Sequence, residues 1–264
     1  MRVTAHYDVS RPYQMRLRRW RHLPTVPEAL ASLLQTIVVA LFLLTFVLQP
    51  FLIPSESMER TLLVGDFLLV NKQIFAPEGR PGSLIRRFLP YREIERGDIV
   101  VFHHRNPPYL IKRVVGLPGD RIRIEQGRVS VNGMPLDEPY AAYEPSAASP
   151  FRENFPARMY TDPSVDPAWW REMQDLTRNG ELVVPPGEYF TLGDNRNHSL
   201  DSRFWGLVPR AAIVARPLVI YFSLRRPSST DVQQAADDRL GHETELAARL
   251  TGFARWRRIF QVVH

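Results

Sequence analysis

The chain has 264 residues, 44% hydrophobic and 23% charged, so it is long enough for a folded core, and wholesale disorder is excluded. It has 23 prolines, 14 glycines and no cysteine, which excludes a disulfide scaffold, a thiol nucleophile and a zinc–thiolate site. The formal net charge of +6 would suit a nucleic-acid binder, but most of the excess lies in residues 1–28, beside an apolar run. We therefore expect no nucleic-acid partner.

The apolar run, Ala29 to Leu48, contains no charged residue and approaches the ~20 residues needed to cross hydrocarbon. Because flanking basic residues stay on the cytoplasmic side, we predict a cytoplasmic segment 1–28, a transmembrane anchor 29–50, and everything later outside. A cleavable signal peptide is the alternative. The run is too long for a typical signal-peptide core, and no small-x-small cleavage site follows it, so a retained single-pass anchor is favoured.

Period-two patterns dominate residues 51–226, which we expect to form a β-rich extracytoplasmic domain. Turns are predicted at Glu125-Gln126-Gly127 and at Asn132-Gly133. Recurring strands without intervening helices favour an antiparallel sheet or barrel over a parallel α/β fold. The predicted strand regions are 66–72, 98–104, 109–117, 121–136, 181–194 and 211–224.

Three segments depart from this pattern. Residues 76–92 are expected to form an extended loop, and residues 140–180 a Pro- and Ser-rich insertion. The insertion is predicted to contain one helix over 166–180, starting at Asp166 and stopping at Gly180. The tail, 227–264, is polar and then helical in pattern. It suits either an amphipathic segment on a membrane surface or a terminal helix or strand packed on the domain.

Two serines, Ser55 and Ser57, follow the anchor directly, and a serine nucleophile needs a base to take its proton. The histidines offer no spacing typical of a Ser-His-Asp triad. The adjacent His103 and His104 are expected to be an exposed pair at a strand end, and His198 lies in a polar motif without an obvious ordering aspartate. No metal-ligand spacing is present, so we expect no metal or other cofactor.

Lysine is the other candidate base, and the sequence contains only Lys72 and Lys112. Lys112 lies in the apolar stretch "YLIKRVVGL", where burial would disfavour the ammonium and lower the pKa by up to ~3–5 units. A neutral amine of this kind can act as a general base, which arginine cannot. An outward-facing strand lysine is the alternative, and the pattern alone favours it.

A third cluster, "GDNRNHSLDSRFWG" at residues 193–206, is dense in polar groups and ends in an aromatic pair. The aromatic pair indicates that the loop is held against the core, so its polar groups need internal partners. Such a network supports catalytic groups, although purely structural networks have the same composition.

Together these stretches resemble the bacterial type I signal peptidases (leader peptidases), which are membrane-anchored Ser-Lys dyad serine proteases. The motifs are "PSESM", "TLLVGDFLLVNK", "RGDIVVF", "IKRVVGLPGD" and "GDNRNHSLDSRFWG". The resemblance implies a mainly β, LexA-like catalytic domain in the bacterial cytoplasmic (inner) membrane. It also implies cleavage of signal peptides from exported preproteins after Ala-x-Ala, in contact with the lipid bilayer and near the secretion translocon.

The resemblance also assigns roles to the matching residues. Ser57 matches the nucleophile, Lys112 the general base, and Ser55 an oxyanion-hole hydroxyl that acts with the backbone N–H of Ser57. Ser199 matches a serine that orients the lysine. The supporting and substrate-pocket positions are Gly193, Asp201 and Arg203, and Phe51, Ile53, Pro54, Leu62 and Ile111 respectively.

Two departures from the family pattern lie close to these residues. Arg60 stands where the family usually has proline, and Asn197-His198 where it has an Asp-Asn pair.

Two other functions remain as rivals. A self-cleaving Ser-Lys repressor is disfavoured by the anchor and by the lack of a DNA-binding helix pair. A catalytically inactive homologue acting as a membrane-tethered binding module is disfavoured because Ser57 and Lys112 are both present.

Overall fold

The computed structural model describes residues 26–72, 92–105, 109–144, 149–225 and 253–264. The chain divides into two compact units, Met1–Leu41 and Phe42–His264. Almost all of the predicted loop 76–92 and most of the tail 227–264 lie outside the described residues.

The described part of the first unit is helical. Helix α1 spans Val26–Phe42 and contains no buried residue, and a π-helical turn, Leu43–Val47, continues it along the chain. The 22 residues Val26–Val47 have a mean hydropathy of 2.4 and are long and apolar enough to cross a membrane. The helix therefore starts before the predicted anchor 29–50 and ends inside it, because Leu48 already begins the first strand.

The larger sheet of the second unit is a curled, antiparallel half-barrel. Its strand order is β1-β2-β12-β3-β4-β10-β11, with β13 paired to β12. These strands are β1 (Leu48–Leu52), β2 (Asp66–Asn71), β3 (Ile99–His103), β4 (Tyr109–Gly116), β10 (Glu188–Leu192), β11 (Val208–Pro209), β12 (Ile213–Ser223) and β13 (Gln261–Val262).

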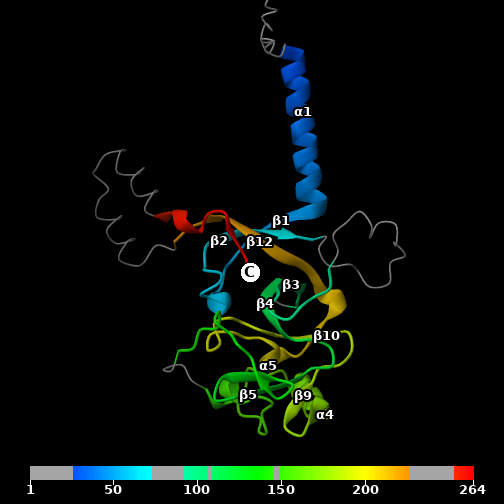
Figure 1. Ribbon diagram of the computed structural model, residues 1–264, viewed down its shortest axis with the longest axis vertical. Coiled ribbons are helices and arrows are strands. Elements are labelled where there is room, and N and C mark those ends of the chain that lie inside the picture. The colour runs from blue at the N-terminus through cyan, green and yellow to red at the C-terminus, as the bar shows by residue number, and fades with distance from the viewer. Residues whose placement is uncertain (1–25, 73–91, 106–108, 145–148, 226–252) are drawn as a thin grey trace, which may run out of the picture. The chain divides into compact units, whose positions relative to one another are not determined.

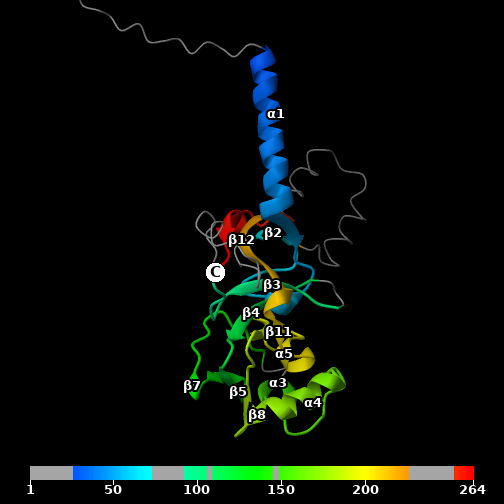
Figure 2. The same cartoon turned by 90° about the vertical axis from the view of Figure 1, so that its right-hand side faces the viewer.

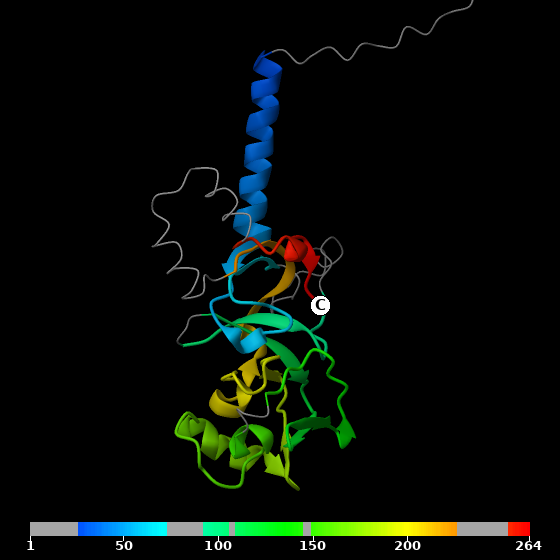
Figure 3. The ribbon, with the colours of Figure 1, turned by 90° about the vertical axis from the view of Figure 1, so that its left-hand side faces the viewer.

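Strand β12 connects the two halves of this sheet. Its first residues pair with β3, and register shifts at Pro217 and Ile220 let the rest follow β2 and β13. Figure 3 shows the C-terminal segment, in red, beside β12. Apolar side chains of β2, β3 and β12 form a core cluster to which Val263, near the C-terminus, also belongs.

A smaller antiparallel sheet has the order β7-β6-β5-β9-β8. Figure 2 shows α3 and α4 close to this sheet, and a buried cluster that includes Trp169, Met173 and Leu182 joins α4 to it. The elements are β5 (Arg121–Glu125), β6 (Arg128–Val131), β7 (Met134–Pro135), β8 (Thr177–Arg178), β9 (Glu181–Val183), α3 (Pro150–Glu153) and α4 (Pro167–Leu176). The described part of this unit also contains four short helical turns: Glu56–Met58, α5 (Ser202–Trp205), Arg210–Ala212 and Trp256–Arg258.

The mainly β, antiparallel architecture confirms the predicted fold class, and all six predicted strand regions contain strands. The hairpin turns at Gln126-Gly127 and Asn132-Gly133 have the predicted positive φ angles. Asp166 caps the predicted helix, since its carboxylate accepts hydrogen bonds from the N–H groups of Ala168 and Trp169.

One predicted helix boundary was wrong. Helix α4 ends at Leu176, and Gly180 lies instead in the turn between β8 and β9, where φ is +78°. In the tail, the described residues 253–264 form a 3-10 turn, Trp256–Arg258, and the short strand β13 rather than a long helix. The packed-strand alternative is therefore correct for this part of the tail.

Candidate active site

Ser57 lies in the helical turn Glu56–Met58, between β1 and β2, with only 8% of its surface exposed. The N–H of Asn195 donates to the carbonyl of Ser57 at 3.1 Å, which ties this turn to the polar loop 193–203. Ser55 precedes the turn in an extended conformation and is exposed. Its Oγ lies 3.5 Å from Oγ of Ser57, so the two predicted hydroxyls are neighbours.

Lys112 projects from β4, an interior strand that pairs with β3 on one side and β10 on the other. It is 2% exposed, so the outward-facing alternative is wrong. Its Nζ lies 2.6 Å from Oγ of Ser57, within hydrogen-bond distance. Two residues 55 positions apart in the sequence therefore meet in one buried contact.

Burial lowers the pKa of Lys112 from 10.5 to about 8. Loss of hydration disfavours the ammonium, while the carboxylates of Asp201 and Asp194 favour it and Arg203 opposes it. Desolvation is the largest of these effects, so the neutral amine becomes accessible near physiological pH. An amine in this state can accept a proton from a hydroxyl within hydrogen-bond distance.

The loop Gly193–Arg203 packs against both residues. Asp201 and Arg203 form a two-pronged ion pair, with Nε–Oδ1 and Nη2–Oδ2 distances of 2.8 Å each. The Gly193 N–H donates to Asp201 Oδ2 at 3.1 Å. A Cβ at Gly193 would lie 2.2 Å from Ser199 Oγ and 2.4 Å from the Ser57 carbonyl oxygen, so only glycine fits there. Ser199 Oγ is buried and makes no hydrogen bond to any described residue, Lys112 included.

Sequence reasoning missed a second buried ion pair beside the dyad residues. Arg113, directly after Lys112, donates from Nε and Nη2 to the two carboxylate oxygens of Asp194, at 2.8 Å each. Thr61 Oγ1 also donates to Asp194, at 2.5 Å. This network links β4, the polar loop and the segment after Ser57. The alternation of a strand could have indicated that Arg113 faces away from Lys112, but not that Asp194 would meet it.

The predicted pocket residues occupy different environments. Ile53 and Leu62 are buried in the core cluster of the large sheet, and Phe51 and Ile111 pack against that cluster while partly exposed. Pro54 is exposed and lines a hollow of about 360 Å³ that also includes Ser55, Glu56, Arg152 and Ser199. Because Leu62 has no exposed surface, it can shape this region only from beneath the other residues.

The two departures from the family pattern have specific contacts. Arg60 is the third residue of the turn Met58–Thr61 and has φ +86°, which proline cannot adopt. Its Nη1 donates to the carbonyl of Ala141 at 2.7 Å. Asn197 Oδ1 accepts from the N–H of Glu144, and His198 pairs with the Glu144 carboxylate at 2.9 Å. All three residues therefore contact the segment Ala141–Glu144.

The two adjacent histidines, His103 and His104, have different environments. His103 is exposed and stacks on Tyr109, with ring centroids 4.5 Å apart. His104 is not a solvated partner to it: its ring packs 5.2 Å from Trp205, and its Nδ1 is buried. Within the described ranges, no group of three or more His, Asp or Glu side chains could hold a metal ion.

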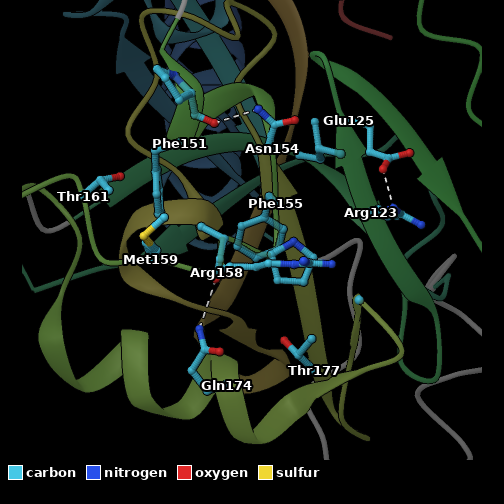
Figure 4. Close-up of a pocket in the computed structure, with 15 residues that line it drawn as sticks. Arg123, Glu125, Phe151, Asn154, Phe155, Arg158, Met159, Thr161, Gln174 and Thr177 are labelled. Atoms are coloured by element: carbon cyan, nitrogen blue, oxygen red, sulfur yellow. Dashed lines mark hydrogen bonds and ion pairs between the residues drawn. The ribbon is translucent and has the colours of Figure 1, made fainter.

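A separate hollow of about 590 Å³ lies between α3, α4 and β5 (Figure 4). Phe151 and Phe155 form part of its wall, and Arg123 and Glu125 pair with each other at its edge. Neither Ser57 nor Lys112 lines it, so it is distinct from the candidate active site.

Comparisons with known proteins agree with this geometry. Residues 26–222 match the family described as signal peptidase, peptidase S26. Signal peptidase I of Pseudomonas fluorescens is 34% identical over 236 residues, covering 83% of this chain and 81% of the relative. Signal peptidase I of Leptolyngbya laminosa is 36% identical over 208 residues, covering 75% and 81% respectively. The chain therefore belongs to the signal peptidase family, peptidase S26, and is a serine endopeptidase.

Proposed function

We propose that the protein cleaves signal peptides from exported preproteins with a Ser57–Lys112 dyad. The observation that carries this proposal is the 2.6 Å contact between Nζ of a buried lysine and Oγ of a buried serine. A buried lysine beside a serine hydroxyl meets the two requirements for nucleophilic catalysis, a base of suitable pKa and a short path for the proton.

In the proposed reaction, neutral Lys112 takes the proton of Ser57 as Oγ attacks the substrate carbonyl. The resulting oxyanion accepts hydrogen bonds from Ser55 Oγ and from the Ser57 N–H, and losing one such donor typically costs ~10²–10³ in rate. The protonated Lys112 then returns its proton to the leaving amine. A water molecule, deprotonated by Lys112, hydrolyses the acyl-enzyme, which frees Ser57 and the signal peptide.

The remaining assignments support this centre. Ser199 is proposed to orient the lysine amine, with Gly193 leaving room beside it and the Asp201–Arg203 pair bracing the loop. Phe51, Ile53, Pro54, Leu62 and Ile111 are proposed to shape shallow subsites that accept small side chains, the Ala-x-Ala preference. Phe51 and Ile111 support this, because both pack against the core cluster that contains Met58, the residue after Ser57, and both are partly exposed.

We further propose that Val26–Val47 is a single membrane anchor in the bacterial cytoplasmic membrane, with the N-terminus cytoplasmic. The arginine-rich segment 1–28 supports this orientation. The catalytic domain, over about 51–226, would then meet preproteins on the far side of the bilayer, near the secretion translocon. Reporter fusions before residue 26 and after residue 225 test it, and the opposite labelling pattern contradicts it.

Cleavage of a preprotein with an Ala-x-Ala site tests the dyad. Wild type should release the mature protein, and Ser57→Ala and Lys112→Ala should each abolish release. Lys72→Ala is the matched control, because Lys72 is the only other lysine and is partly exposed, bonded to the carbonyl of Thr45. Wild-type cleavage by Ser57→Ala or Lys112→Ala would refute the assignment. An inactive wild type would favour the membrane-tethered binding module.

A further inference from the structure

The polar loop Gly193–Arg203 is held by arginine side chains that donate to its carbonyl groups. Arg196 Nε donates to the carbonyl of Gly193 at 3.0 Å, and Arg203 Nη2 donates to that of Arg196 at 2.8 Å. Both of these arginines belong to the loop itself. The carbonyl of Ser199 accepts instead from Nη1 of Arg152, at 2.5 Å. Arg152 lies on α3, inside the insertion 140–180.

Arg152 is itself fixed on both sides. Its own carbonyl accepts from Nη1 of Arg203 at 2.9 Å, so the two arginines bind each other's segments. Its guanidinium carbon lies 4.5 Å from the centre of the Phe204 ring. Phe151, the residue before it, is buried against the same ring. A side chain stacked on one face and bonded at its tip has little freedom, so it can hold a backbone in place.

The group that Arg152 holds is the backbone of Ser199, whose Oγ is buried and makes no hydrogen bond of its own within the described residues. No hydrogen bond therefore fixes the direction of this hydroxyl, and its place depends on the backbone that carries it. The Ser199 side chain lies so close to Gly193 that an added Cβ there would clash with its Cβ and Oγ. A small shift of the Ser199 carbonyl would move the hydroxyl relative to Lys112.

We propose that Arg152 is a positioning residue: it fixes the place of Ser199, the proposed lysine-orienting serine, and thereby makes the insertion 140–180 part of the catalytic apparatus. The inference rests on the proposed function, in which Ser199 orients the lysine. Arg152 itself touches neither Ser57 nor Lys112, so it acts through the loop. A displacement of about 1 Å at a supporting residue can cost ~10²-fold in rate.

A competing role is visible in the same geometry, because Arg152 also lines the hollow beside Ser55 and Glu56. There it would bind substrate directly. The two roles predict different kinetics: loss of positioning lowers kcat, whereas loss of a substrate contact raises KM.

The test measures cleavage of an Ala-x-Ala preprotein by the full-length enzyme and three variants. Arg152→Met keeps an apolar chain over Phe204 but removes the donor, and Arg152→Lys restores one donor. Arg171→Ala is the matched control, since Arg171 is an exposed arginine of α4 in the same insertion. Thermal unfolding of each variant is recorded, and kinetics are measured where all are folded. If Arg152→Met does not fold, Arg152→Leu, which also keeps an apolar chain and has no donor, replaces it.

Arg152→Met should lower kcat roughly ten- to a hundredfold, the range for a hydrogen bond to a charged group, with little change in KM. Water would reach Lys112 more easily, so the acid limb of the kcat/KM profile should move to higher pH. Arg152→Lys should recover most of kcat, and Arg171→Ala should match wild type.

Two results would overturn the inference: a wild-type kcat in Arg152→Met or its replacement, or a rise in KM with kcat and the acid limb unchanged. The dyad assignment fails separately, if Ser57→Ala cleaves as well as wild type. Loss of activity in Ser57→Ala together with an unchanged Arg152 variant would reject the positioning role and leave the dyad standing.

Discussion

Protonation of Lys112 should switch off cleavage as the pH falls. The pKa of about 8 places the loss of the neutral amine just below that pH, rather than near the ordinary value of 10.5. The perturbation is a pH change from about 10 to about 6, applied to wild type and to Lys112→Met. Methionine has a similar length and no charge, so it removes the base while filling the buried site.

The expected changes in activity and in stability both follow from the ordinary pKa of 10.5 and the folded pKa of about 8. At pH 7, roughly 10% of Lys112 would be neutral with a pKa of about 8, against ~0.03% with a pKa of 10.5, a gain of roughly 300-fold. Below pH 8, kcat/KM should fall about tenfold per pH unit. Holding the lysine at the lower pKa costs the folded state roughly 3 kcal/mol wherever the group is charged.

The sign of the effect on stability follows from proton binding. Between about pH 8 and 10.5 the unfolded chain binds more protons at Lys112 than the folded chain, so the contribution of Lys112 to stability rises with pH across this window. The stability that neutral Lys112 contributes is therefore lost as the pH falls to the folded pKa of about 8. Lys112→Met should therefore be more stable than wild type at pH 7, and the difference should shrink as the pH approaches 10.

The assay is a pH profile of kcat/KM for wild type, together with denaturant unfolding of wild type and Lys112→Met at pH 7 and pH 10. Lys72→Ala serves as the control and should follow wild type in both. An acid limb centred near 10.5, or a flat profile between pH 6 and 8, would refute the reasoning. So would a Lys112→Met variant that is destabilised equally at both pH values.

Two further substitutions test the surroundings of the dyad. Gly193→Ala should lower kcat at least tenfold and cost about 1–3 kcal/mol in the free energy of unfolding, because the new Cβ meets Ser199 Oγ at 2.2 Å and the Ser57 carbonyl at 2.4 Å; an unchanged kcat, measured at a temperature where the variant is folded, would contradict this. Asp66→Asn should cost about 3–5 kcal/mol, because the buried carboxylate accepts from Ser223 and pairs with Arg255 and Arg258. Proteolysis should then release the segment 253–264, and equal protection in wild type and variant would show that this segment is held by other contacts.

The local elements followed from the sequence because their causes are local. The run from Ala29 to Val47 contains no charged residue, glycine or proline, so a helix there could be predicted from local composition alone. The strands follow period-two patterns, and their turns occur where Gly127 and Gly133 permit positive φ. The wrong end of α4 has a local cause too: Gly180 suits a hairpin turn as well as a helix stop, and the composition does not separate the two.

The pairings within the site could not be predicted from residue types. Arg113 and Asp194 are 81 positions apart, and Arg152 and Ser199 are 47 apart. Each arginine suits a solvated surface equally well, and the chain contains many of them. Only the sheet order, which brings β4 beside β10, places Asp194 and the polar loop next to Arg113 and Lys112.

The sequence by itself determined the apolar helix, the mainly β domain, and Ser57 and Lys112 as the candidate pair. Only the tertiary structure decided that Lys112 points inward, since alternation along a strand defines two faces but not which of them is covered. From Lys112 to Gly116, β4 is buried on both faces, so a lysine there loses its hydration whichever way it points. That long-range burial lowers its pKa and places its amine 2.6 Å from Ser57.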